Sequence, residues 1–294
     1  MSKVDRDPCA IEMTTPMADP AAPRELEELE IELLLEGIRR RYGYDLRDYD
    51  RSSIRRRVQA RLREEGLDTT TQLLERVLRD GAALDALLDG REDFVESFFR
   101  PARVWKSLRR KAIPALRTYP SVRAWAVGGV PEGHLASLLL LFQEELSRAY
   151  TLYATELRPP QDGRGRWPSF PRTRLRSLAK AYTAAGGRGR LSEFLEEANG
   201  QSRLADSTQN HLLVASHNPA TDASFNEFHL ILARHTMTEF NDSLRDRVQR
   251  LIDDSLVRFG FLLLGPGERP AGVPGRYKEI DRGAGLYQKL VNSG

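Results

Sequence analysis

The glycine-containing turn at residues 128–134 is the segment whose residue types come nearest to a chemical site. An apolar segment at residues 122–127 leads into this turn, and a long apolar helix is predicted to follow at residues 135–146. A second predicted strand, at residues 151–155, ends at Glu156. In a strand–helix–strand unit, turn glycines let the backbone approach a nucleotide cofactor, and an acid after the second strand accepts hydrogen bonds from ribose hydroxyls.

The composition of this turn conflicts with that role. The turn reads Gly128-Gly129-Val130-Pro131-Glu132-Gly133-His134. Pro131 has no N–H to offer a ligand, and Glu132 adds a charged side chain where small residues are needed. The sequence therefore predicts the fold of a nucleotide-binding unit, with a turn that is altered for cofactor binding.

Length and composition limit the remaining possibilities. The chain has 294 residues, of which 40% are hydrophobic, so it can form one large domain or two modest ones. No apolar run reaches the roughly 20 residues that span a bilayer, so we expect no membrane insertion. Residues 1–24 lack signal-peptide features and are predicted to be a disordered leader. The single cysteine, Cys9, lies in this leader and cannot form an internal disulfide, which favours a cytoplasmic location.

Arginine is concentrated in two stretches, residues 51–63 and 158–190, although the net formal charge is only +3. Arginine suits bidentate binding of carboxylates and phosphates. The alternative is that both stretches are ordinary solvated surface. Nucleic-acid binding is a third interpretation of the basic clusters, but we do not expect it because no recognised nucleic-acid-binding module is present.

Residues 25–90 are predicted to form a small helical domain. Ile54, Val58 and Leu62 form an i, i+4, i+8 apolar stripe, and Ser52 or Ser53 is the expected cap of that helix. Gly66 is expected to end the helix. A helical connector is predicted to follow at residues 93–116.

Residues 91–294 are predicted to form a second domain, of the α/β class. Beyond the strand–helix–strand unit, the expected elements are strands at residues 211–216, 228–233, 261–264 and 285–291 and an amphipathic helix at residues 242–257. Because strands alternate with helices, we expect a mostly parallel sheet that is covered on both faces.

Short motifs in most of the chain after residue 24 point to one family. They are Tyr42-Gly43-Tyr44-Asp45, Ser97-Phe98-Phe99-Arg100, Tyr153-Ala154-Thr155, Ala185-Gly186-Gly187-Arg188, residues 222–232 and residues 254–265. Together they resemble the CheR-type chemotaxis protein methyltransferases, which use S-adenosylmethionine to methylate receptor glutamates. The resemblance implies a small N-terminal helical domain and a Rossmann-like S-adenosylmethionine-dependent methyltransferase domain, whose final strand is antiparallel.

The resemblance also implies where the cofactor would be bound. The matching positions are Arg100, Gly128, Glu156, Asn218 and His235. Arg100, Gly128 and Asn218 keep the family residue. Glu156 replaces an aspartate that binds the ribose, and His235 replaces an asparagine that faces the cofactor.

Other positions depart from the family pattern. Phe94 and Glu96 replace an asparagine and a threonine that contact the cofactor, and Glu132 replaces the second turn glycine. Gly133 replaces the glutamate that receives the cofactor's ammonium group, and Glu239 replaces the tyrosine near the transferring methyl. Losing one charged hydrogen bond costs roughly 1.5–3 kcal/mol, so two or three such losses weaken binding about a thousandfold.

We therefore interpret the chain as a CheR-like protein with impaired or lost S-adenosylmethionine binding, and we assign no catalytic residue. The alternative is an active protein-glutamate O-methyltransferase that acts on chemoreceptors. The resemblance implies that an acidic helical region of a chemoreceptor-like protein is the partner. The residues expected to bind it are Arg55, Arg56, Arg57 and Arg61.

Histidines do not form a recognisable metal-binding pattern in this sequence. His134 and His235 could be ligands in principle, but the chain has only five histidines and no cysteine near them. Ordinary polar placement is the better interpretation, so no metal site is predicted.

Overall fold

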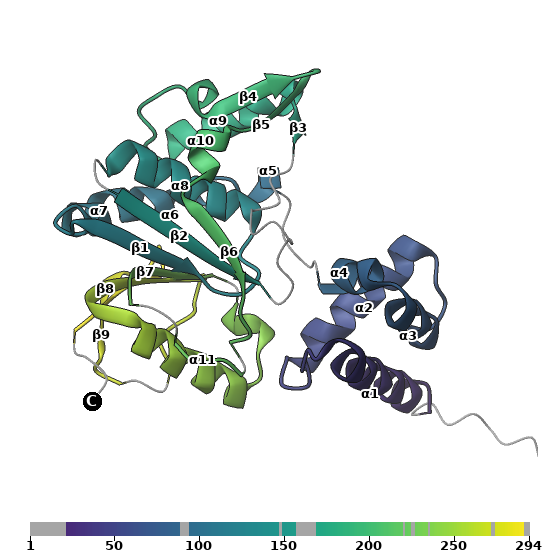
Figure 1. Cartoon of the computed structure of the whole chain (residues 1–294). Helices are drawn as coiled ribbons and strands as arrows, with labels where there is room; N and C mark the ends of the chain where they lie inside the picture. The colour runs from purple at the N-terminus through teal and green to yellow at the C-terminus, as the bar shows by residue number, and fades with distance from the viewer. Residues whose placement is uncertain are drawn as a thin grey trace, which may run out of the picture.

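A computed structural model describes residues 22–88, 94–146, 149–156, 169–219, 221–224, 227–234, 236–271 and 274–290 (Figure 1). Of the leader predicted at residues 1–24, residues 1–21 lie outside the described residues. Helix α1 begins at Ala22, three residues before the predicted domain start.

The N-terminal domain is built from four helices: α1 (Ala22–Tyr42), α2 (Arg51–Glu65), α3 (Thr70–Arg79) and α4 (Gly81–Leu88). The cap of α2 is Asp50, whose side chain accepts a hydrogen bond from the Ser53 amide, so the predicted serine cap was wrong. Gly66 ends α2 with a left-handed φ of 65°, as predicted. Thr69 and Gln72 form a capping box at α3, which satisfies two amides that the helix leaves unpaired.

The connector is helical over the described residues 94–116, as predicted, but it is divided into short segments. It contains α5 (Phe94–Ser97), α6 (Ala102–Ser107), a π-helical turn (Leu108–Ala112) and α7 (Ile113–Leu116). Pro101 cannot donate the backbone hydrogen bond that a continuous helix needs, and Phe99 adopts a left-handed φ of 50° just before it.

A seven-stranded sheet forms the centre of the second domain, in the order β6-β2-β1-β7-β8-β10-β9. The strands are β1 (Ser121–Ala126), β2 (Ala149–Glu156), β6 (Leu212–Ser216), β7 (Phe228–Ala233), β8 (Leu256–Leu264), β9 (Tyr277–Asp281) and β10 (Leu286–Lys289). The pairs β1–β2, β1–β7, β2–β6 and β7–β8 are parallel, whereas β10 runs antiparallel to β8 and β9. The predicted fold class and antiparallel final strand are confirmed, and β9 is the strand of this sheet that was not predicted.

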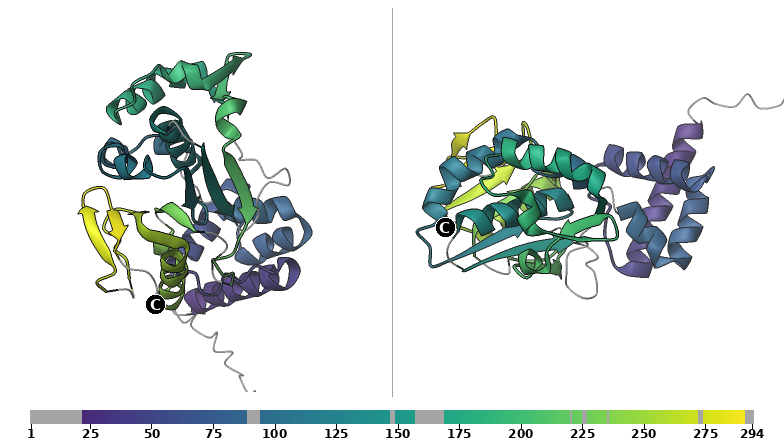
Figure 2. Two further views of the ribbon diagram at one scale, coloured as in Figure 1. Left: turned by 60° about the vertical axis from the view of Figure 1, so that its left-hand side comes forward. Right: turned by 90° about the horizontal axis from the view of Figure 1, so that it is seen from above.

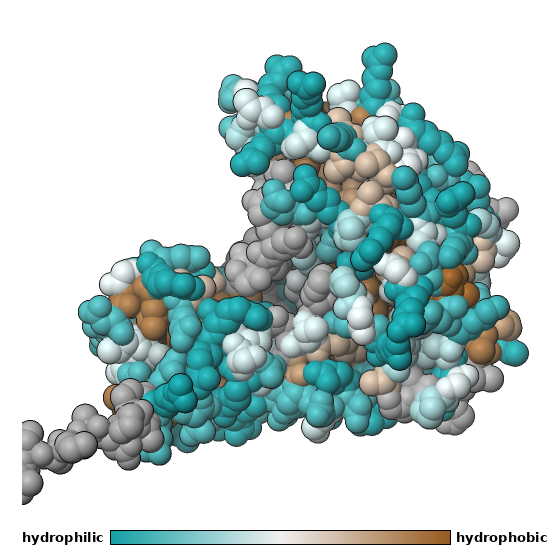
Figure 3. All heavy atoms as spheres, turned by 180° about the vertical axis from the view of Figure 1, so that it is seen from behind, coloured by the Kyte–Doolittle hydropathy of each residue, from teal (hydrophilic) through white to brown (hydrophobic). Residues whose placement is uncertain are grey.

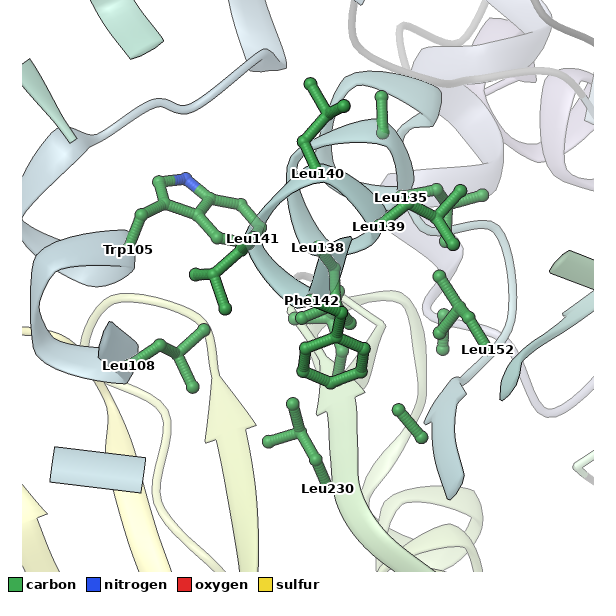
Figure 4. Packing of buried hydrophobic residues seen from close by; sticks show 14 of the residues in the cluster. Trp105, Leu108, Leu135, Leu138, Leu139, Leu140, Leu141, Phe142, Leu152 and Leu230 are labelled. Carbon is green, nitrogen blue, oxygen red and sulfur yellow. The ribbon is translucent and has the colours of Figure 1, made fainter. Parts of the chain in front are cut away.

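Helices cover both faces of this sheet (Figures 1 and 2). Val122, Ala124 and Ala126 of β1 pack on the side of α8 (Glu132–Glu145), while Trp125 and Val127 pack on the side of α11 (Asp242–Ser255). This alternation follows from the two-residue period of a strand. Figure 4 shows the leucines and Phe142 of α8 lying over β7 and β2, and each buried leucine stabilises the fold by about 1.5–3 kcal/mol.

A second, three-stranded sheet was not predicted. It consists of β3 (Phe170–Pro171), β5 (Gln201–Leu204) and β4 (Leu195–Ala198), in that order. Asn199 and Gly200 connect β4 to β5 with φ values of 51° and 75°, which is the two-residue turn that hairpins prefer. The small sheet lies beside α9 (Leu175–Ala184) and α10 (Asp206–Gln209), on the α8 side of the large sheet (Figure 1).

Candidate functional site

The carboxyl ends of four parallel strands bring the predicted cofactor residues to one edge of the sheet. The Val127 amide donates to the Leu232 carbonyl at 2.9 Å, and the His217 amide donates to the Glu156 carbonyl at 3.1 Å. Thr236 follows β7, and its hydroxyl donates to the Val127 carbonyl at 2.8 Å. These bonds tie the ends of β1, β2, β6 and β7 together, which is where ligands bind in sheets of this type.

Gly128 has a backbone conformation that favours glycine. Its φ is 54°, and a Cβ added there would lie 3.5 Å from Thr236 Cγ2 and 4.0 Å from Pro219 Cγ. Gly129 is also left-handed, with φ of 67°, but nothing lies within 4 Å of an added Cβ. Glycine is therefore needed at both positions for the backbone conformation, rather than for lack of space.

The rest of the turn serves packing more than ligand binding. Val130 is 4% exposed and belongs to the core under α8. Pro131 precedes the first turn of α8 without a side-chain cap, and Glu132 provides an acidic group in that turn. A carboxylate at a helix N-terminus interacts favourably with the helix dipole. Gly133 is buried, and its carbonyl accepts a hydrogen bond from Ser137.

The segment from Ser97 to Arg100 is held against the first turns of α8. The Phe99 amide donates to Ser137 Oγ at 2.7 Å, and His134 Nε2 lies 3.0 Å from the Arg100 carbonyl oxygen. The Phe99 ring contacts the rings of Trp105 and Tyr182, each with centroids 5.5 Å away. His134 is thus a buried structural residue, and no group of three metal-binding side chains occurs among the described residues.

The guanidinium group of Arg100 is paired within its own segment. Its Nη1 lies 3.1 Å from Glu96 Oε2, one helical turn earlier, and both side chains are about half exposed. A residue that the family resemblance assigns to the cofactor therefore already faces a carboxylate of this chain. Glu96 occupies the position where the family has a threonine.

Glu156 and Asn218 lie at neighbouring strand ends and are both partly exposed. The backbone N–H of Asn218 donates to Asp222 Oδ2 at 2.9 Å, which fixes the loop after β6. His217 is buried against Trp125, with ring centroids 5.4 Å apart. The expected contact at His235 lies outside the described residues, as do the side chains of Phe94 and Glu239.

A buried charge network behind α8 was not foreseen from the sequence. Arg109 donates to Glu145 at 2.7 Å and also to Glu144, and these three side chains are at most 9% exposed. Glu144 accepts further hydrogen bonds from the Tyr182 hydroxyl and from the Arg188 amide. The network therefore anchors the motif at residues 185–188, which has a structural role.

Most of the arginines expected to bind a partner are engaged within the helical domain. Arg55 pairs with Glu28 of α1 at 2.7 Å. Arg57 and Arg61 donate to the Leu88 and Ala86 carbonyls of α4, and all three arginines are partly buried. Arg56 is the exposed member of the set, on the outer side of α2 with Arg63.

None of the described helices is long and apolar enough to cross a bilayer.

A family model described as "CheR methyltransferase, all-alpha domain" matches residues 29–90. The boundary predicted at residues 90 and 91 lies outside the described residues.

Relatives that cover about four fifths of the chain point to the same family. The Cher3 protein of Pseudomonas putida, which is named as a putative methyltransferase, is 34% identical over 82% of this chain and 89% of its own length. A chemotaxis protein methyltransferase of Listeria innocua is 23% identical over 79% of this chain and 87% of its own. Among solved structures, a TehB-like SAM-dependent methyltransferase from Corynebacterium glutamicum is 13% identical, with a TM-score of 0.32, over 74% of this chain and 96% of that chain. With the all-alpha match and the extent of the Pseudomonas similarity, this chain belongs to the CheR-type methyltransferase family.

Proposed function

We propose that this CheR-type protein binds S-adenosylmethionine very weakly and acts in the cytoplasm by binding an acidic protein surface. The observation that carries the proposal is the turn between β1 and α8. Pro131 precedes the helix there and provides no side-chain cap, Glu132 adds a carboxylate to the first turn, and Gly133 offers no side chain.

Part of the sheet edge still fits the cofactor. Gly128 keeps the left-handed backbone of a cofactor turn, and Glu156 and Asn218 stand beside it at strand ends where they can accept hydrogen bonds from ribose or adenine. When bound, S-adenosylmethionine supplies an activated methyl group, and the protein's task is to position the accepting carboxylate.

The methionine end of the cofactor fits poorly. It carries an ammonium and a carboxylate group, and Gly133 has no carboxylate for the ammonium. The cofactor's carboxylate would compete with Glu96 for the guanidinium group of Arg100. At roughly 1.5–3 kcal/mol for each charged hydrogen bond, these two losses weaken binding by about a hundredfold to ten-thousandfold.

The first test restores the turn. We expect the variant Pro131→Thr/Glu132→Gly/Gly133→Glu, which keeps the buried His134, to bind S-adenosylhomocysteine more tightly than the unmodified chain in isothermal titration calorimetry. Adding Glu96→Thr releases Arg100 and should increase the affinity again, by about tenfold. Glu75→Thr is the matched control, because Glu75 forms an exposed i, i+4 pair with Arg79 away from the sheet edge. If all variants bind S-adenosylhomocysteine with the affinity of the unmodified chain, these residues are not the cause of weak cofactor binding.

The second test concerns the acidic partner. Arg56 and Arg63 are exposed and lie seven residues apart on the same side of α2, so an acidic helix can contact both. With a glutamate-rich helical peptide as the probe, Arg56→Glu/Arg63→Glu should weaken binding about tenfold, and added salt should weaken binding by the unmodified chain. Arg79→Glu, on an arginine that is 78% exposed in α3, serves as the control. If neither the charge reversal nor added salt changes the affinity for the peptide, this surface is excluded as the binding site.

An active methyltransferase is the second candidate. The retained Gly128 conformation and the neighbouring Glu156 and Asn218 favour it. Transfer of a labelled methyl group from S-adenosylmethionine to a receptor fragment by the unmodified chain would establish this alternative.

A further inference from the structure

Exposed large apolar side chains gather on one side of the helical domain. Leu26, Leu29 and Leu33 of α1 are 58%, 51% and 50% exposed, and Leu78 of α3 is 37% exposed. Helices α1 and α3 are in close contact at Gly37, because a Cβ built on Gly37 would lie 3.4 Å from Leu78 Cδ2. We call these four leucines the α1 leucine face. They are four of the six exposed large apolar residues among those the structure describes.

This face is a second apolar stripe on α1. The buried stripe of the helix consists of Ile31, Leu34, Leu35 and Ile38, which are at most 1% exposed. Leu26, Leu29 and Leu33 recur at intervals of three and four residues on the opposite side, because 3.6 residues make one turn. A surface helix needs one apolar stripe to pack on its own domain, so the second stripe indicates a contact with another molecule.

Charge along α1 indicates what that molecule is. The exposed acidic residues near the stripe, Glu25 and Glu32, lie in the N-terminal part of the helix. Among the exposed basic residues of α1, Arg24 lies beside Glu25, whereas Arg40 and Arg41 lie at the C-terminal end, where Arg40 also pairs with Glu36 at 2.6 Å. An antiparallel second copy of α1 would place the carboxylates of each helix near the guanidinium groups of the other, whereas a parallel copy would place like charges together.

The same charge pattern disfavours a partner of one sign. An acidic peptide would be repelled by Glu25 and Glu32, and a basic peptide by Arg40 and Arg41. A helix with the same pattern in the opposite direction satisfies both ends, and two-fold symmetry provides such a helix from the chain itself. We propose that the α1 leucine face is a homodimer contact in which two copies of α1 pack antiparallel.

Sedimentation equilibrium of the full chain over a roughly hundredfold range of concentration tests this contact. The unmodified chain should shift from monomer to dimer as the concentration rises, and Leu33→Glu should weaken the dimer at least about tenfold. Leu213→Glu is the matched control, since Leu213 is 49% exposed on β6, away from α1. A chain that stays monomeric throughout, or a dimer that Leu33→Glu leaves intact, would overturn the proposal.

A charge exchange tests the orientation and does not depend on leucine substitutions. Arg40→Glu/Arg41→Glu should weaken the dimer, Glu25→Arg/Glu32→Arg should do the same, and the four changes together should restore it. In a Cys9→Ser background, Leu26→Cys and Arg40→Cys variants should crosslink to one another when mixed, in preference to crosslinking with themselves. No restoration, or preferential crosslinking of identical variants, would exclude antiparallel packing.

Discussion

Two adjacent carboxylates, Glu144 and Glu145, show how single residues fix the shape of the methyltransferase domain. Arg109 reaches both of them, and Arg117 also pairs with Glu145, which is 3% exposed. A buried ion pair of this kind adds little when intact, but losing one partner leaves a buried charge and costs about 3–5 kcal/mol.

Stability should therefore depend on the protonation of Glu144. Burial alone would raise the pKa of this carboxyl, but hydrogen bonds from Tyr182, Arg109 and the Arg188 amide outweigh it and hold the pKa below the usual 4.5. The ionised group stabilises the fold above pH 4.5, and this contribution is lost as the pH falls through the lowered pKa of the folded state.

We expect Glu144→Gln to be less stable than the unmodified chain by about 2 kcal/mol at neutral pH in urea unfolding. The difference should shrink as the pH falls below 4.5, where the carboxyl of the unfolded chain becomes protonated. Glu75→Gln, at a residue that is 66% exposed, should change stability little at any pH. A difference for Glu144→Gln that stays constant down to strongly acidic pH would refute the role of its charge.

At the scale of elements, the turn after α9 is shaped by one glycine. A Cβ added to Gly187 would lie 2.4 Å from the Tyr182 ring, whereas a Cβ added to Gly189 would lie 3.3 Å from the end of the Glu193 side chain. The Tyr182 ring cannot move freely, because it is 1% exposed and contacts Phe99.

Gly187→Ala should therefore destabilise the chain by about 1–3 kcal/mol, as overpacking does. Gly189→Ala is the control, and it should cost clearly less because the flexible Glu193 carboxylate can move aside. Thermal unfolding of both variants measures the difference. Equal destabilisation by the two alanines would show that the contact with Tyr182 does not set the geometry of this turn.

Elements with a strong repeat were predictable from the sequence. The strand expected at residues 228–233 is β7 as observed, and the helix expected from residue 242 begins there in α11. The second sheet was missed because β3 and β4 are short and largely exposed, although Asn199-Gly200 is a recognisable hairpin signal. The division of the helical connector into short segments was not predicted, because its apolar residues continue on both sides of Pro101.

The candidate site was predictable only in part. The strand ends that hold Gly128, Glu156 and Asn218 followed from the alternation of strands and helices and from the family resemblance. The pairing of Arg100 with Glu96 and the ion pairs of Arg55 depend on which side chains meet after folding. Residue types alone gave no signal that these arginines would be engaged inside the chain.

At the scale of the whole molecule, the helical domain projects from one side of the larger domain (Figures 1 and 3). The two domains meet where Tyr49 and Phe240 pair, with ring centroids 5.1 Å apart. There the backbone N–H of Asn241 also donates to the Asp48 carbonyl at 3.0 Å. Asn241 also caps α11 through its side chain. The helical domain therefore contacts the segment between β7 and α11. This segment lies at the same edge of the sheet as Gly128.

The central claim concerns what this sheet edge binds. It is tested most directly by isothermal titration calorimetry of the unmodified full chain with S-adenosylmethionine and with S-adenosylhomocysteine. We predict no saturable binding of either compound at concentrations where a complex of about −8 kcal/mol would be complete. A dissociation constant in the low micromolar range for either compound would contradict the proposal that this chain binds the cofactor very weakly.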